Sequence, residues 1–99
     1  MEKRTAHCKL KTVKALVAAE KVRVTYSALQ SAAALGFDVD GVLAVVAALT
    51  TADFFKSMTT YENHQVWQDV YRPFSSTGIQ LYVKITVIDG VLIVSFKEK

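Results

Sequence analysis

Apolar residues recur at helical spacing near the start of the chain, between lysines. They stand at Leu10, Val13, Leu16 and Val17. A spacing of three or four predicts an amphipathic helix over residues 7–19, with one apolar face for the core. The opposite face carries Lys9, Lys11 and Lys14. We interpret such a run first as a solvated surface and only second as a nucleic-acid contact.

Two further helices are predicted before the middle of the chain. Ser27 and Gln30 form an S-x-x-Q capping box, which opens a helix that ends at Gly36. The third helix begins at Asp38 or Asp40 and continues through an apolar run with almost no polar positions. We therefore expect the third helix to be the most buried of the three.

The end of the chain has the alternating pattern of a β-hairpin. Residues 79–88 alternate between two faces, and Asp89-Gly90 follows as a two-residue type I′ turn. If Ile88 faces Val91, three apolar pairs fall on one face and can be buried together. The apolar pairs on that face are Val87 with Leu92, Ile85 with Val94, and Val83 with Phe96.

The same register makes Tyr82 and Lys97 direct cross-strand neighbours on the other face, with Cβ atoms about 5 Å apart. A strand over residues 67–74 is predicted to join this hairpin through a loop at 75–78. The effective length of that loop is ambiguous by one residue, and a slip of one residue turns every side chain to the opposite face. The side chains that share the face of Tyr82 are therefore either Gln68 and Arg72, or Trp67, Asp69 and Tyr71.

The composition is that of a single compact domain. The 99 residues are 52% hydrophobic and carry a net charge of +3, so residues 1–99 are expected to form one domain around a modest core. This charge permits a polyanionic partner without requiring one. The longest later apolar run, at 42–49, is too short to cross a bilayer. Since the single Cys8 also fits a reducing compartment, we expect a cytoplasmic protein without membrane contact.

No metal or other cofactor is expected. The sequence has one cysteine, Cys8, and two histidines, His7 and His64. A structural zinc site cannot be assembled from these cysteine and histidine side chains alone. P-loop, dinucleotide-binding and paired-carboxylate motifs are absent from the sequence.

The central stretch and the hairpin supply a cationic and phenolic set of side chains. They are Lys56, Tyr82, Lys84 and Lys97, with Gln68 and Arg72 added in one of the two registers. Chemistry on a phosphodiester needs cations near the phosphoryl oxygens and groups that move protons, and such a face supplies both. Two plainer interpretations stay open. In the first, Tyr82 and Lys97 form an ordinary solvent-facing cross-strand pair. In the second, which concerns a different residue, His64 is a loop residue without a catalytic role.

Four sequence motifs resemble one known family. They are Met-Glu-Lys-Arg-Thr at 1–5, Phe-x-Lys-Ser-Met-Thr-Thr-Tyr at 54–61, Trp-Gln-Asp-Val-Tyr-Arg-Pro at 67–73, and Leu-Ile-Val-Ser-Phe-Lys-Glu-Lys at 92–99. Together they closely resemble the MqsR messenger-RNA interferase toxins of bacterial toxin–antitoxin modules. The resemblance implies a RelE-like α+β fold, with helices packed on a small antiparallel sheet. It also implies ribosome-independent endonucleolytic cleavage of messenger RNA at short GC-containing sequences.

The resemblance further implies a partner and a set of site residues. The expected partner is an MqsA-type antitoxin protein that carries zinc and a DNA-binding domain, so any contact with DNA is indirect. The implied catalytic residues are Lys56, Gln68, Tyr82 and Lys97. The implied RNA-binding residues are Tyr61, His64, Arg72 and Lys84. The loop at 74–78 is one residue longer than the family pattern, which leaves the RNA sequence preference open.

Two hypotheses of different class follow. In the first, the chain is a metal-independent endoribonuclease that uses the 2′-hydroxyl of the RNA as nucleophile. Tyr82 or Lys56 is then the general base, and Gln68 orients the nucleotide. Lys97 and Arg72 stabilise charge on the phosphoryl oxygens. In the second, the chain is a non-enzymatic binding module that acts through a protein partner on the polar sheet face.

Overall fold

The computed structural model describes residues 1–63 and 65–99. Over these residues the chain forms three α-helices and one six-stranded sheet, which confirms the predicted α+β class. The helices are α1 (Leu10–Ala18), α2 (Tyr26–Ala34) and α3 (Val39–Ala47), followed by a 3₁₀ helix, η1 (Thr51–Asp53). The strands are β1 (Glu2–Lys3), β2 (Val22–Val24), β3 (Phe54–Thr59), β4 (Trp67–Tyr71), β5 (Leu81–Ile88) and β6 (Val91–Glu98).

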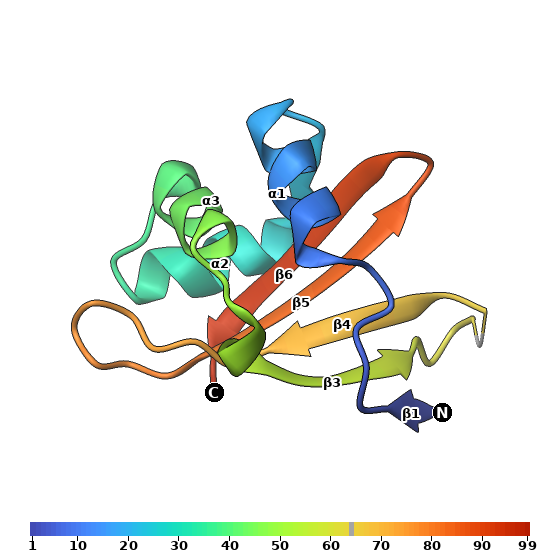
Figure 1. The fold of residues 1–99 in the computed structure, drawn as a ribbon. Coiled ribbons are helices and arrows are strands. Elements are labelled where there is room, and N and C mark those ends of the chain that lie inside the picture. Colours follow the sequence, from blue (N-terminus) through green and yellow to red (C-terminus); the bar gives the residue numbers. More distant parts are fainter. Residues whose placement is uncertain (64) are drawn as a thin grey trace.

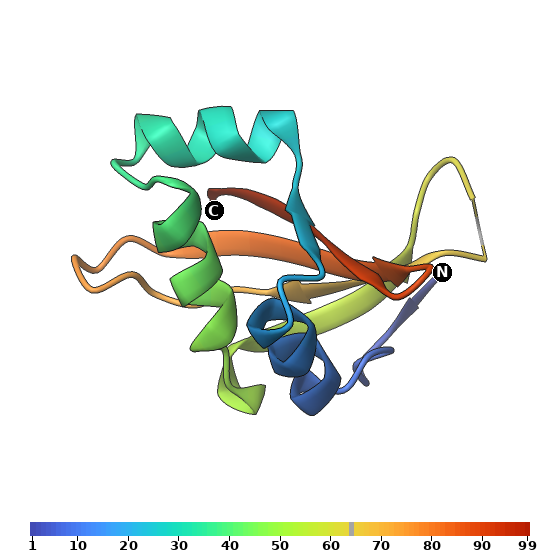
Figure 2. The same cartoon turned by 90° about the horizontal axis from the view of Figure 1, so that it is seen from above.

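The sheet runs in the order β1-β3-β4-β5-β6-β2. Neighbouring strands are antiparallel except β2 and β6, which are parallel. Figure 1 shows the three helices on one side of the sheet, and the view from above in Figure 2 places them over and beside β5 and β6. Within the described residues, no helix covers the other side.

The C-terminal hairpin has the predicted register, from Ile88 opposite Val91 to Leu81 opposite Glu98. Asp89 and Gly90 have φ of 52° and 75°, the left-handed conformation that a type I′ turn requires at both central positions. The apolar face of the hairpin packs against the helices. The buried residues of that core are Val13, Ala28, Ala32, Val42, Val46, Leu49, Tyr71, Leu81, Val83, Ile85, Leu92, Val94 and Phe96.

The second helix is capped differently from the prediction. The hydroxyl of Thr25 accepts the backbone N–H of Ala28 at 3.2 Å and acts as the N-cap of α2. The predicted capping box does not form, because the Gln30 side chain instead donates to the Tyr26 hydroxyl at 3.1 Å. A threonine two residues upstream of Ser27 is also a favoured cap, so the sequence pattern alone did not identify the start of this helix.

The third helix begins as predicted, with the Asp38 carboxylate accepting the backbone N–H of Gly41 at 2.7 Å. It is the most buried of the three, as predicted, because it has the fewest exposed residues. Val42 and Val46 are fully buried, whereas Ala44 and Ala47 are exposed. Small alanines face solvent at little cost, so a helix without polar residues still has an outer face.

The edges of the sheet were not predicted. At one edge, Val22–Val24 forms β2 and pairs in parallel with β6. At the other edge, β1 pairs Glu2 with Met58 of β3. In the described ranges, no single helix has the length and apolar character to span a membrane. Only α2 and α3 taken together, with a 95° bend, meet that test.

Candidate active site

Cross-strand pairing arranges the side chains of the uncovered side of the sheet in rows, because paired residues point to the same face. The lysine row consists of Lys56, Val70, Lys84 and Ser95. The β4–β5 register continues unchanged to a bridge between Phe74 and Gln80. The tyrosine row therefore consists of Arg72, Tyr82 and Lys97. We call this side, which carries both rows, the open face.

Tyr82 and Lys97 are paired on the open face as the hairpin register predicted. The Lys97 ammonium lies 5.2 Å from the centre of the Tyr82 ring, within the range of a cation–π interaction. Tyr82 is half-buried and Lys97 is exposed. The phenol and the ammonium therefore both belong to a surface that an extended ligand can reach.

The structure resolves the ambiguous register of β4. Gln68 lies opposite Met58, and Val70 lies opposite Lys84, so Gln68 and Arg72 share the open face with Tyr82. Asp69 and Tyr71 point to the helix side, where each is 1% exposed. All four residues implied as catalytic thus lie on the open face.

Lys56 forms an ion pair with Glu2, which the sequence did not suggest. Lys56 is 22% exposed and Glu2 is 57% exposed. The hydrogen bond and the charge of Lys56 hold the pKa of the Glu2 carboxyl below its usual value. Strand β1, only two residues long, places Glu2 beside β3. So short a strand has no alternation to detect, which is why sequence analysis missed this contact.

Phe55 was also missed, and it lies at the centre of a cluster of cations. The β3–β4 register shifts between Phe54 and Lys56, so Phe55 is the extra residue of a β-bulge. The Arg72 guanidinium lies 3.7 Å from the centre of the Phe55 ring. The Lys56 ammonium is 5.2 Å and the Arg4 guanidinium 6.0 Å from the same ring. Phe55 therefore helps to hold Arg72 at the edge of the tyrosine row.

The remaining predicted RNA-binding residues are spread over the surface. Lys84 is half-buried in the lysine row, beside the fully buried Val70. Tyr61 follows β3, away from the tyrosine row, and is 98% exposed. His64 lies outside the described residues.

The helix side of β4 carries a buried anchor for the N-terminal segment. The two carboxylate oxygens of Asp69 accept the backbone N–H groups of His7 and Cys8, each at 2.9 Å. His7 stacks on Trp67 with ring centres 5.9 Å apart. Burial, followed by the charge of Asp69, raises the pKa of the Cys8 thiol. Among residues 1–63 and 65–99, no three His, Cys, Asp or Glu side chains are grouped as metal ligands.

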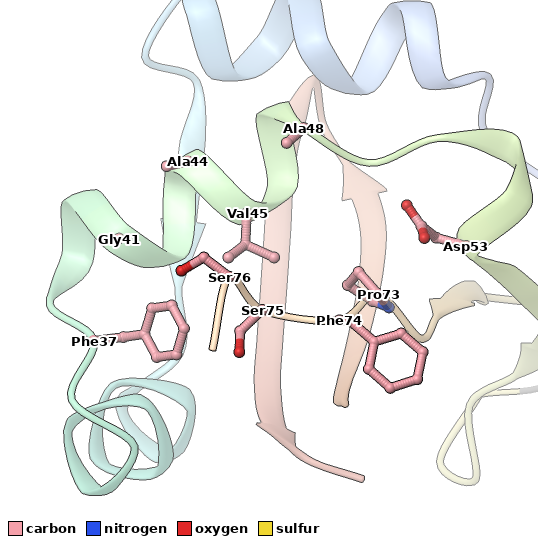
Figure 3. Close-up of a pocket in the computed structure, with 10 residues that line it drawn as sticks. All are labelled: Phe37, Gly41, Ala44, Val45, Ala48, Asp53, Pro73, Phe74, Ser75 and Ser76. Atoms are coloured by element: carbon pink, nitrogen blue, oxygen red, sulfur yellow. The ribbon is translucent and has the colours of Figure 1, made fainter. Parts of the chain in front are cut away.

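A cavity of about 390 Å³ lies between α3 and the segment that follows β4, and Phe74 of that segment is one of its lining residues. Figure 3 shows Phe37, Val45 and Ser76 around it. Its lining includes none of the residues implied as catalytic. The polar chemistry of the described chain therefore gathers on an open sheet surface, the form expected for an extended polymer rather than an enclosed small molecule.

Comparison with known proteins identifies the family. Residues 5–98 match the model of the family described as motility quorum-sensing regulator, toxin of MqsA. The chain belongs to the MqsR toxin family. It is also 61% identical to the mRNA interferase toxin MqsR of Escherichia coli (strain K12), over the full length of both chains. Membership of the MqsR family confirms the resemblance carried by the four motifs.

Proposed function

We propose that this MqsR-family chain is an endoribonuclease toxin that cleaves messenger RNA on its open face. The observation that carries the proposal is that Lys56, Gln68, Tyr82 and Lys97 all lie on that one face. The name of the Escherichia coli relative, an mRNA interferase toxin, supports the same activity. No observation favours the alternative of a non-enzymatic binding module.

The proposed reaction is an internal transesterification. The 2′-hydroxyl on the 5′ side of the scissile phosphate attacks phosphorus, and the bond from phosphorus to the 5′ oxygen breaks. Tyr82, reacting as its phenolate, accepts the proton of the 2′-hydroxyl and becomes a phenol, and an ammonium group protonates the departing 5′ oxygen. The products are a 2′,3′-cyclic phosphate and a 5′-hydroxyl. Since the nucleophile belongs to the RNA, the reaction needs no metal-bound water.

The cations of the open face stabilise the charge that grows on the phosphoryl oxygens. Lys97 lies directly beside Tyr82, and Arg72 lies on the other side of Tyr82 in the same row. Lys56 forms an ion pair with Glu2, and an ammonium group at this position is suited to bind phosphate or donate a proton. Gln68 lies one row away from Lys56 and orients the nucleotide through its amide.

The finer properties of the proposal concern substrate and partner. We propose that cleavage occurs without the ribosome, in the cytoplasm, at short GC-containing sequences. We also propose Tyr61, His64 and Lys84 as further RNA-binding residues. The family description, toxin of MqsA, supports an MqsA-type antitoxin as the neutralising partner.

Cleavage of a defined messenger RNA by the purified protein tests the proposal. Cleavage is expected to persist in excess EDTA and to leave a 2′,3′-cyclic phosphate. A substrate with a single 2′-deoxy nucleotide on the 5′ side of the cut is expected to stay intact. Cleavage of that substrate, or inhibition by EDTA, would show that the mechanism is wrong. A wild-type protein that cuts no RNA at all would favour the binding module.

A further inference from the structure

We propose that Phe74 is a stacking platform for a base of the RNA strand, next to the nucleotides held by the tyrosine row. The inference deepens the proposed function and rests on it. Phe74 is 67% exposed, although a phenylalanine normally buries its ring. The position of Phe74 on the sheet, close to the tyrosine row, makes its exposed ring available to a bound RNA strand.

Phe74 lies on the open face, one row beyond Tyr82. It forms an antiparallel bridge with Gln80, and the carbonyl of Gln80 accepts the backbone N–H of Lys99 at 3.0 Å. Phe74, Gln80 and Lys99 therefore continue the sequence of rows past the tyrosine row. Residues two apart on one strand face are separated by about 7 Å. This separation is of the order of one nucleotide step in an extended single strand.

The backbone around Phe74 is fixed by hydrogen bonds. Ser75 donates its N–H to the carbonyl of Ile79 at 2.8 Å, and Leu81 donates to the carbonyl of Pro73, also at 2.8 Å. The Ser75 hydroxyl accepts the N–H of Ile79 at 3.1 Å. Pro73 is buried on the helix side, and Figure 3 shows the Phe74 ring turned away from α3. The ring is thus held outside the core by ordered backbone.

The surrounding charge favours a nucleotide as the occupant. The charged side chains of the tyrosine row and of the row beyond it are Arg72, Lys97 and Lys99, and all of them are cations. An aromatic ring among cations offers a stacking face for a base and counter-charges for the flanking phosphates. An apolar protein partner would leave these cations desolvated against its surface.

Substitutions at Phe74, measured on RNA that the wild-type protein cleaves, test the inference. Phe74→Ala is expected to weaken RNA binding, or raise KM, by about 5- to 150-fold, the range for loss of one base–aromatic stack. Phe74→Leu should lose as much, because it keeps an apolar side chain but no π-face. Phe74→Trp should bind as well as the wild type. Tyr26→Ala is the matched control, since Tyr26 is a 75% exposed aromatic residue on α2.

An abasic nucleotide placed in turn on each side of the cut identifies the stacked base. The wild type should lose affinity at one of these positions, and Phe74→Ala should be insensitive at that position. If Phe74→Ala or Phe74→Leu binds and cleaves as the wild type does, Phe74 is no stacking platform, and the proposed nuclease function stands. If the wild type cuts no RNA, the proposed nuclease function is wrong, and the inference about Phe74, which rests on it, is wrong as well. A Phe74→Ala protein that loses only antitoxin binding overturns the inference in favour of a protein contact.

Discussion

Most side chains on the open face take no part in the packing of the hydrophobic core. Tyr82 and Lys97 contact each other across two strands, and the apolar packing of those strands lies on the opposite face. Val70 is the exception, because it is fully buried in the lysine row. Apart from Thr86, which is also buried, the polar residues of this face are therefore open to substitution with little effect on the core, which makes their chemistry testable.

Tyr82→Phe and Lys56→Ala should each abolish RNA cleavage and leave the fold intact. Tyr82→Phe removes the proton acceptor, and Lys56→Ala removes a cation from the phosphate. Substitutions at partly exposed positions usually change the free energy of unfolding by no more than about 0.5 kcal/mol. Cleavage rates and denaturant unfolding, measured on the same preparations, check both statements. Cleavage by Tyr82→Phe at the wild-type rate would remove the phenol from the mechanism.

Tyr71 makes the stability of the fold sensitive to alkaline pH. Burial, followed by the charge of Asp69, raises the pKa of Tyr71 from 10.0 to about 12. Between these values the unfolded chain has released the phenolic proton and the folded chain has kept it. The free energy of unfolding should therefore fall as pH rises from 10 to 12, and the titration of Tyr71 should account for part of this fall. Unfolding of Tyr71→Phe across this range should show a shallower fall, and parallel profiles would contradict the assignment.

At the scale of elements, a strand's register and face could be predicted only where its own sequence and the adjoining turn determine them. The hairpin of β5 and β6 was predicted in register, because strict alternation and the Asp89-Gly90 turn fix it independently. The face of β4 was not, since the loop before β5 left the parity open. The bridge from Phe74 to Gln80 and the buried contacts of Asp69 decide that parity in the structure. These contacts join segments far apart in sequence and leave no local signal.

The N-terminal segment shows the same limit. Strand β1 is two residues long, and the contact between Glu2 and Lys56 spans more than half the chain. The resemblance to the MqsR family nevertheless implied catalytic roles for Lys56, Gln68, Tyr82 and Lys97, which share the open face. It placed no role on Phe55, whose position in a bulge beside Arg72 depends on tertiary structure.

Asp69→Ala should release the N-terminal segment from β4. The substitution removes both acceptors of the His7 and Cys8 N–H groups. Loss of hydrogen bonds to a buried charged acceptor costs about 1–3 kcal/mol. Amide hydrogen exchange at His7 and Cys8 should accelerate, while the amides of β5 keep their relative order of protection. Asp69→Asn, which retains one acceptor oxygen, is the matched control and should show a smaller effect. Unchanged exchange at His7 would refute this anchoring role.

The whole molecule divides its two sheet faces between stability and chemistry. Helices α1, α2 and α3 cover the apolar face of β5 and β6 (Figure 2). The opposite face holds the lysine and tyrosine rows without helical cover in the described chain. A strand of RNA lying across these rows would meet several cations at once. Such a surface binds through many phosphate contacts, and its affinity must depend on salt.

The affinity for single-stranded RNA should therefore fall linearly with salt concentration on logarithmic axes, with a slope of about −0.7 for each phosphate contact. Lys84→Ala removes one cation from the lysine row, so its slope should be shallower by about 0.7. Lys14→Ala is the matched control, because Lys14 is an exposed lysine of α1 on the helix side. Its slope should equal that of the wild type. Titrations with a 2′-deoxy substrate, which is bound but not cut, supply the affinities. The two variants should differ in slope only if phosphates contact the lysine row, which contains Lys84 but not Lys14. Equal slopes for Lys84→Ala and Lys14→Ala would therefore place the phosphate contacts elsewhere.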